Sequence, residues 1–248
     1  MIEVNHISKS FGGNQVLFDI TTRFTKGKNN LIIGRSGSGK TVLLKCIIGL
    51  YVIDEGDILY EDRSLMAMDF DSRKSLRKEF GTLFQGGALF SSLTVEENVM
   101  FPLTMNTEMG YKEKLDRVNF CLHRVRLENA NKLYPSQLSG GMTKRVAIAR
   151  AISLNPRYLF CDEPNSGLDP STANVIDKLI NEITEEYQIT TIVNTHDMNS
   201  VMEIGDQVAF IHDGHLWWEG SKEDILQSDN KELNDFVFAT ELTRKLKK

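Results

Sequence analysis

Residues 34–41 read Gly34-Arg35-Ser36-Gly37-Ser38-Gly39-Lys40-Thr41, which is the spacing of a phosphate-binding loop. The glycines let successive backbone N–H groups point at phosphate oxygens without interference from a Cβ. Lys40 supplies a positive charge for the β- and γ-phosphates, and Thr41 presents a hydroxyl to Mg²⁺. A glycine-rich turn without a ligand is the alternative, but the pattern arises by chance in only roughly one chain in a hundred of this length.

The segments on either side place this loop between a strand and a helix. Residues 30–33 form a short apolar run that is typical of a buried parallel strand, and residues 42–48, beginning with Val42, fit a helix. The positive end of that helix would point at the same phosphate. We therefore expect residues 34–42 to contact a nucleotide.

The composition is that of an ordinary globular protein. Of the 248 residues, 41% are hydrophobic and 25% are charged, and the net charge of −5 gives no reason to expect a nucleic-acid surface. No stretch approaches the roughly 20 apolar residues of a membrane span, and residues 1–4 do not resemble a signal peptide, so we expect a cytoplasmic location. Cys46, Cys121 and Cys161 lie among apolar residues, which favours reduced core thiols over a disulfide or a metal site.

Hydrophobic periodicity predicts an α/β fold. Residues 17–24 alternate, with Phe18, Ile20, Thr22 and Phe24 on the inner side of a half-buried antiparallel strand. Residues 157–162 and 190–195 read as buried parallel strands, each with a polar residue where it emerges, and an apolar helical stripe lies between them. That stripe comprises Val175, Ile176, Leu179, Ile180 and Ile183. A last pair of strands, 207–211 and 216–219, is joined by a turn at Asp213-Gly214.

The strand signal fades from residue 96 to about residue 155. Helical spacing of Leu115, Val118, Leu122 and Val125 and a second helix near Ser139 indicate a helical insertion in an α/β core. We expect a P-loop NTPase (RecA-like) core with an N-terminal antiparallel β subdomain and an inserted α-helical subdomain. Within one domain spanning 1–248, residues 1–85 and 156–225 would form the core, 86–155 the helical subdomain, and 226–248 a helical extension.

Two carboxylates, Asp162 and Glu163, follow the buried strand that begins at residue 157. Most Asp-Glu pairs are solvated turns. Here the pair follows a buried strand downstream of a phosphate loop, where one carboxylate can hold Mg²⁺ and the next can orient or deprotonate the attacking water. This position favours phosphoryl-transfer chemistry over a solvated turn.

A second glycine-rich turn, Leu138-Ser139-Gly140-Gly141, precedes a predicted helix. Ser139 alone reads as an ordinary N-cap. A serine hydroxyl beside a helix N-terminus can also hold an anion, although one nucleotide needs only one such cradle.

Together with His196, these motifs resemble the nucleotide-binding subunit of ATP-binding-cassette (ABC) transporters, and the resemblance covers nearly the whole chain. It implies an ATPase with ATP and Mg²⁺ as cofactors. It also implies a head-to-tail homodimer, in which Ser139, Gly140 and Gly141 of one copy contact the γ-phosphate held by the other. The loop Ser166–Asp169 would cross the interface between the copies.

The resemblance also implies a role for each site residue. Phe11 would stack on adenine, as aromatic rings stack on bases. Lys40, Gln85, Glu163 and His196 would form the catalytic set, in which Glu163 acts on the water and His196 contacts the γ-phosphate. The residues implied around Mg²⁺ are Thr41, Gln85 and Asp162.

Two details resemble one subgroup, the MlaF-like ATPases of Mla/Mce-type phospholipid transporters: Met142 in place of the usual Gln, and residues 86–99 after Gln85. Residues 230–238 are similar to the same subgroup. The resemblance implies permease subunits whose cytoplasmic helix enters a groove near residues 85–99, an Mce-type lipid-binding protein and a small regulatory subunit. The chain would then lie at the cytoplasmic face of the inner membrane.

Other functions remain open. An importer of another small solute would use a very similar cassette, and a non-transport ABC ATPase would share the catalytic motifs. A small-molecule kinase would leave Ser139-Gly140-Gly141 unexplained, and a GTPase would need an Asn-Lys-x-Asp motif, whereas Asn131-Lys132 and Asn230-Lys231 lack the final Asp. Leu233, Phe236 and Val237 share a helical face before the basic residues 244–248, so this helix either packs on its own domain or contacts a twin or regulatory subunit.

Overall fold

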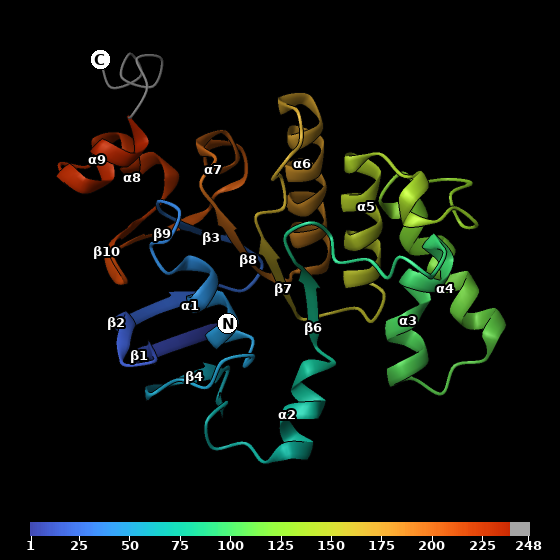
Figure 1. The fold of residues 1–248 in the computed structure, drawn as a ribbon, viewed down its shortest axis with the longest axis horizontal. Helices are drawn as coiled ribbons and strands as arrows, with labels where there is room; N and C mark the ends of the chain where they lie inside the picture. Colours follow the sequence, from blue (N-terminus) through green and yellow to red (C-terminus); the bar gives the residue numbers. More distant parts are fainter. Residues whose placement is uncertain (239–248) are drawn as a thin grey trace.

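The structure, a computed structural model, describes residues 1–238, whose strands form two sheets (Figure 1). The first sheet is antiparallel, with strand order β2-β1-β4-β5. Its strands are β1 (Ile2–Phe11), β2 (Asn14–Phe24), β4 (Glu55–Tyr60) and β5 (Arg63–Ser64).

The second sheet has the order β10-β9-β3-β8-β7-β6, and its strands run parallel except for β10. Its strands are β3 (Asn29–Ile33), β6 (Phe80–Leu83), β7 (Tyr158–Asp162), β8 (Thr190–Thr195), β9 (Gln207–His212) and β10 (His215–Gly220). The carboxyl ends of the parallel strands share one edge, which is where such sheets place ligands. The expected α/β architecture with an N-terminal antiparallel sheet is thus confirmed.

The helices fall into groups around these sheets. They are α1 (Lys40–Ile47), α2 (Phe70–Arg77), α3 (Val95–Asn106), α4 (Tyr111–Arg124), α5 (Gly140–Ala151), α6 (Pro170–Tyr187), α7 (Met198–Ile204), α8 (Lys222–Gln227) and α9 (Lys231–Val237), with a 3₁₀ turn at Pro135–Gln137. Helices α3, α4 and α5 follow one another between β6 and β7 and lie together in Figure 1. None of the described helices is long and apolar enough to cross a membrane.

Both faces of the parallel sheet are covered, so β3 is buried at every position. Its side chains alternate between two cores. Leu31 and Ile33 belong to the core shared with α3–α6, whereas Ile32 belongs to the core around α1 and the antiparallel sheet. Helix α1 is therefore held between the two sheets, and the loop before it starts from a rigid strand.

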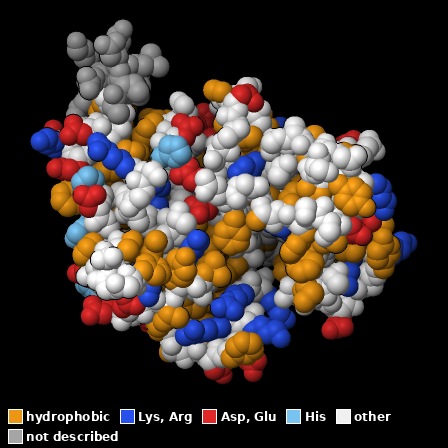
Figure 2. Space-filling model, viewed as in Figure 1, with side chains coloured by type: hydrophobic (Ala, Val, Ile, Leu, Met, Phe, Trp, Pro, Cys, Tyr) orange, Lys and Arg blue, Asp and Glu red, His pale blue; other side chains and the backbone are white. Residues whose placement is uncertain are grey.

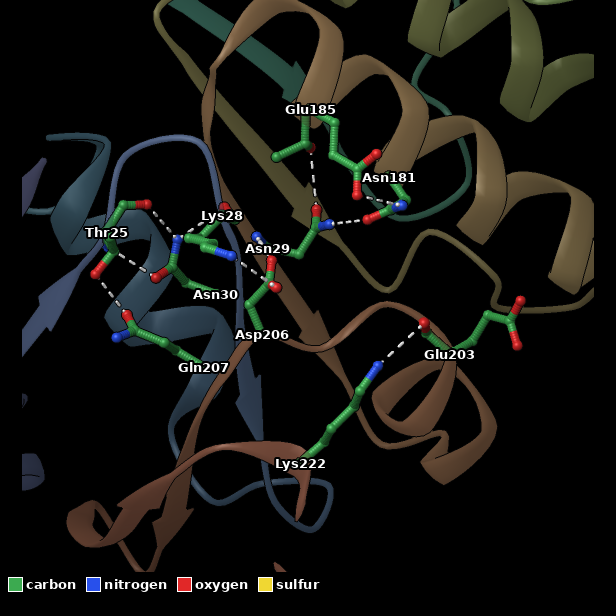
Figure 3. Close-up of polar contacts among 11 residues, drawn as sticks. Thr25, Lys28, Asn29, Asn30, Asn181, Glu185, Glu203, Asp206, Gln207 and Lys222 are labelled. Carbon is green, nitrogen blue, oxygen red and sulfur yellow. Dashed lines mark hydrogen bonds and ion pairs between the residues drawn. The ribbon is translucent and has the colours of Figure 1, made fainter. Parts of the chain in front are cut away.

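The beginning of β3 is fixed by buried polar groups (Figure 3). The Asn29 backbone N–H donates to Asp206 at 2.8 Å, and the Asn29 side chain donates to Asn181 at 2.7 Å. The buried Asn30 amide donates to the carbonyls of Thr25 and Thr191. These bonds satisfy groups that would be costly to bury unpaired.

The expectation that Phe18, Ile20, Thr22 and Phe24 share the buried side of β2 is wrong for Phe18. Leu17 is fully buried, whereas Phe18 is only half-buried. Asp19 has a left-handed φ of 49°, and the pairing of β2 with β1 shifts register there, so the alternation reverses at this bulge. On α6, Val175 is also misassigned, because it is exposed while the other four residues of the predicted stripe are buried.

The three cysteines are buried and free, as expected. Burial raises the pKa of Cys46 to about 12 and that of Cys121 to about 11, so both stay protonated at neutral pH. Helix α9 packs on its own chain through Leu233 and Val237, and Phe236 stacks on Phe210. The basic run at 244–248 lies outside the described residues.

Candidate nucleotide site

The phosphate loop depends on glycine for its shape. Gly34 has φ 150°, and a Cβ there would overlap the carbonyl oxygen of Ile211. Gly39 has φ 106° and forms the N-cap of α1, and no side chain within residues 1–238 caps that end. The first amides of α1 therefore remain open to an anion.

Lys40 lies inside this loop. It is 6% exposed, and its ammonium donates to the carbonyls of Gly34 at 2.8 Å and Arg35 at 3.1 Å. Burial lowers the pKa of Lys40, while the nearby Glu163 and Asp162 oppose this shift. The buried Ser38 hydroxyl has no hydrogen-bond partner among the described residues, so the loop holds donors that fit phosphate oxygens.

Thr41 and Asp162 meet beneath the loop. The Thr41 hydroxyl donates to Asp162 Oδ1 at 3.2 Å, and the buried amide of Asn194 donates to the same oxygen at 3.1 Å. Within residues 1–238 there is no cluster of three His, Cys, Asp or Glu side chains for a metal. One hydroxyl and one carboxylate still fit Mg²⁺, because this ion keeps several waters and takes its other ligands from substrate phosphates.

Glu163 and His196 come from neighbouring strands, at the ends of β7 and β8. His196 Nδ1 lies 2.8 Å from Glu163 Oε1, and since a carboxylate only accepts, Nδ1 carries the proton. The Glu163 side chain is 16% exposed and that of His196 is 64% exposed. The buried Lys144 of α5 donates to the Glu163 carbonyl at 3.4 Å, and burial lowers the pKa of Lys144.

A cavity of about 470 Å³ opens over these groups. Its lining comprises Val16, Arg35, Ser36, Gly37, Gly39, Lys40, Thr41, Val42, Gln85, Glu163, His196 and Phe236. The structure thus gathers most of the predicted phosphate-loop and catalytic residues around one space.

Phe11 is absent from this lining. It is 41% exposed and packs edge-on against Tyr51, with ring centroids 5.1 Å apart. Val16 and Phe236 line the cavity instead, and nothing in the sequence around either residue indicates a role in a nucleotide site. An aromatic residue on a short C-terminal helix carries no local signal for a nucleotide site.

Ser139, Gly140 and Gly141 also lie outside this cavity. Ser139 caps α5 by accepting a hydrogen bond from Met142 N at 3.3 Å, and Ser139 and Gly140 are exposed. Figure 1 shows α5 and α1 on opposite sides of α6. Within one chain, the second glycine turn and the phosphate loop are therefore separate.

Charge is unevenly spread over the face seen in Figure 2. Lys and Arg side chains gather near its lower edge, where Figure 1 places α2. Helix α2 carries Arg73, Lys74 and Arg77, and Lys78 follows it. This basic region is distinct from the cavity lining.

The sequence and the fold are both similar to those of known proteins. Residues 17–166 match the family model described as ABC transporter. The chain is 38% identical to the methionine import ATP-binding protein MetN of Clostridium tetani, over 98% of the chain and 76% of that protein. It is 36% identical to the intermembrane phospholipid transport system ATP-binding protein MlaF of Haemophilus influenzae, over 96% of the chain and 90% of that protein.

A third relative is longer than this chain. The probable ribonucleotide transport ATP-binding protein mkl of Mycobacterium bovis is 36% identical over 95% of the chain, which spans 66% of that protein's length.

The fold is also similar to that of a solved protein. The dimeric structure of MJ0796, a bacterial ABC transporter cassette, has a TM-score of 0.82 at 31% identity and covers 90% of this chain and 99% of its own. A second dimeric structure of MJ0796 shows a post-hydrolysis state bound to ADP and Pi, with a TM-score of 0.81.

Proposed function

Since the chain belongs to the ABC transporter family of ATPases, we propose that it is the ATP-hydrolysing motor subunit of a transporter. One observation carries this proposal: a single cavity is lined by Lys40, by Thr41, which donates to Asp162, and by the hydrogen-bonded pair of Glu163 and His196. That combination serves phosphate binding, metal binding and water activation together.

In the proposed mechanism, residues 34–42 bind the triphosphate of ATP. Lys40 exchanges its two carbonyl acceptors for phosphate oxygens, which bind an ammonium more strongly. Thr41, Asp162 and Gln85 would hold Mg²⁺, which would neutralise charge on the β- and γ-phosphates. Phe11 does not line the cavity, but its ring is 41% exposed, and we propose that it meets the adenine ring of bound ATP.

Glu163 orients the attacking water and accepts its proton. The N–H of His196 holds the Glu163 carboxylate in place, and the exposed ring lines the cavity that would hold the γ-phosphate. Positioned groups of this kind act on a transition state whose charge is spread over the phosphoryl oxygens.

We further propose a head-to-tail homodimer. The exposed Ser139-Gly140 turn lies away from its own phosphate loop, so it is free to complete the site of a second copy. The dimeric structures of MJ0796 support a dimer of this chain. ATP would then be bound tightly only between two copies.

The permease would contact a groove of about 300 Å³ between β6 of the parallel sheet and helices α3 and α5. Its lining includes Phe84, Phe90, Phe101 and Pro102. Arg150 also lines the groove and donates to the carbonyls of Gly87 and Ala88. These carbonyls follow Gln85 closely, so a helix bound in the groove can sense the nucleotide site. This contact would hold the chain at the cytoplasmic face of the inner membrane.

For the cargo, we propose phospholipid, with an Mce-type lipid-binding protein and a small regulatory subunit as further partners. The similarity to MlaF along 90% of that protein supports this choice. The similarity to MetN favours a second candidate, import of a small solute such as methionine. Proteins that co-purify from detergent-solubilised membranes decide between them: an Mce-type protein supports lipid transport, whereas a periplasmic solute-binding protein rejects it.

Glu163→Gln tests the motor function. The variant should bind ATP with unchanged affinity, lose turnover and accumulate as an ATP-bound dimer by light scattering. Hydrolysis near the wild-type rate would reject the role of Glu163, and a chain that stays monomeric with Mg-ATP, with and without its permease, would reject the ATP-bound dimer.

A further inference from the structure

We propose that helix α2 contacts the acidic phospholipids of a membrane surface. The part of the helix concerned is its basic face, which we define as Phe70, Arg73, Lys74 and Arg77. None of these residues lines the nucleotide cavity. The inference rests on the proposed function only in placing the chain beside a permease, and therefore close to a membrane.

The four residues of the basic face lie on one side of α2. Their spacing is i, i+3, i+4 and i+7, which brings side chains to the same face of an α-helix. Leu76 is the buried residue of α2, and its position in the helix lies off this face. The two acids at the start of the helix also lie off it. Asp69 is the N-cap, where it accepts from the Ser72 backbone N–H at 2.8 Å, and Asp71 is in the first turn.

The three cations of the basic face form no ion pair within the described part of the chain. The side chains of Arg73 and Arg77 donate to backbone carbonyls at 3.4 Å, and Lys74 is exposed. The neighbouring Arg63 shows the contrast, because it is paired with Glu79 at 2.7 Å. The chain as a whole has a net charge of −5. Three uncompensated positive charges on one face of one helix therefore favour an anionic partner at this place.

Apolar side chains extend the same surface. The ring of Phe70 is 76% exposed at the start of α2. Val52 and Met66 are also exposed, and they line a small cleft together with Arg73 and Arg77. A free phosphate ion would satisfy the cations and leave these apolar groups in water. A lipid surface satisfies both, and a basic face with an aromatic residue is typical of helices that lie among lipid headgroups.

The basic face lies next to the groove that we assign to the permease. Helix α2 ends at Arg77, and β6, which lines that groove, begins at Phe80. Lys and Arg side chains gather near the lower edge of the face in Figure 2, where Figure 1 places α2 below β6. A permease helix seated in the groove would hold α2 near the cytoplasmic leaflet. Acidic lipids give that leaflet a negative surface potential, which complements the charge of α2.

Flotation of the full chain with lipid vesicles tests the proposal. The wild type should bind vesicles that contain phosphatidylglycerol, show little binding to pure phosphatidylcholine, and be released by high salt. Lys74→Gln combined with Arg77→Gln should raise the apparent Kd about fivefold for each charge removed, or about 25-fold together. Equal binding of the wild type to both kinds of vesicle refutes the proposal. Equal binding by the wild type and the double variant also refutes it, because the contact then lies elsewhere on the chain.

Lys112→Gln combined with Lys231→Gln is the matched control. It makes the same change in net charge at exposed lysines on α4 and α9, and it should keep the Kd of the wild type. An equal loss in the control would show that binding depends on total charge, which overturns the role of α2. Phe70→Ser should weaken binding to phosphatidylglycerol vesicles several-fold, because burial of the ring adds to the attraction. Unchanged binding of this variant would contradict the contact of the ring with lipid.

Co-purification in detergent distinguishes lipid from the permease as the partner of α2. If α2 met an acidic surface of the permease, the Lys74 and Arg77 double variant would co-purify with less permease, and that result rejects the lipid contact. Undiminished co-purification together with weaker vesicle binding supports it. Failure of the proposed motor function would show as Glu163→Gln retaining hydrolysis, and vesicle binding by the full chain does not depend on hydrolysis.

Discussion

The imidazole of His196 donates to the carboxylate of Glu163 across a distance of 2.8 Å, and this bond joins the end of β8 to the end of β7 at the mouth of the cavity. Glu163 itself adopts a left-handed φ of 51°. A strained backbone and an exposed histidine partner are typical of a catalytic arrangement and add little to stability.

His196→Ala should therefore reduce turnover without unfolding the protein. We expect kcat to fall by about 10² to 10³-fold, because the variant loses both the support of the carboxylate and a donor to the phosphoryl group. ATP affinity should change little. Steady-state hydrolysis and fluorescent-nucleotide titration measure the two effects, and equal losses in both would indicate a binding role instead.

Lys40→Ala should weaken nucleotide binding itself. The buried ammonium is replaced by a methyl group, so the phosphates lose a charge-assisted partner and Kd for ATP should rise at least about tenfold. Isothermal calorimetry measures the change. The contrast with Glu163→Gln is the control, and a variant that binds ATP normally would show that Lys40 acts only after binding.

Gly34→Ala should destabilise the fold by about 3 kcal/mol or more, since its Cβ would overlap the Ile211 carbonyl and its φ of 150° is unfavourable. Gly37→Ala is the matched comparison. Its φ is also positive, but no atom lies within 4 Å of the added Cβ, so the cost should be about 1 kcal/mol. Urea unfolding measures both, and equal losses would contradict the steric argument.

Asp177, a buried carboxylate on α6, should make the free energy of unfolding fall as pH rises between about 4 and 6. The native pKa is raised from 3.8 to about 6, so the folded state binds more protons than the unfolded state in that window. The cost is fully present above pH 6 and amounts to about 3 kcal/mol at most. Asp177→Asn should remove this dependence, and the difference between the two unfolding curves against pH isolates it from the other carboxylates.

A mixing experiment tests whether each ATP site combines the phosphate loop of one copy with Ser139 of the other. Lys40→Ala and Ser139→Ala should each be inactive alone, because each spoils both sites of a symmetric dimer. In a mixed dimer, one site combines the intact loop of the second variant with the intact Ser139 of the first. An equimolar mixture should then recover about a quarter of wild-type activity, whereas sites built within one chain would give no recovery.

The sequence predicted the parts of the fold that depend on local pattern. The loop at residues 34–41, the strands before Asp162 and His196, and the cap at Ser139 all follow from spacing, and the structure contains each of them. The error at Phe18 arose because a single bulge at Asp19 reverses alternation, and periodicity cannot detect one inserted residue.

The remaining site residues depend on tertiary contacts. Phe236 reaches the cavity because α9 packs against β9. Lys144 reaches Glu163 because α5 packs against β6, the neighbour of β7 in the sheet. Neither contact has a local signature. Asn194 was recognisable as a polar residue at the end of a buried strand, but its bond to Asp162 requires the pairing of β7 with β8.

The buried amides of Asn29 and Asn30 have a mechanical consequence. Their hydrogen bonds form only in one register of β3 against its neighbouring strands. A shift of one residue would leave several buried polar groups without hydrogen-bond partners. The strand that leads to the phosphate loop is therefore held in one position by the hydrogen bonds at its start. We therefore expect movement that accompanies ATP hydrolysis to occur in the loops that carry Gln85 and His196, while β3 keeps its position.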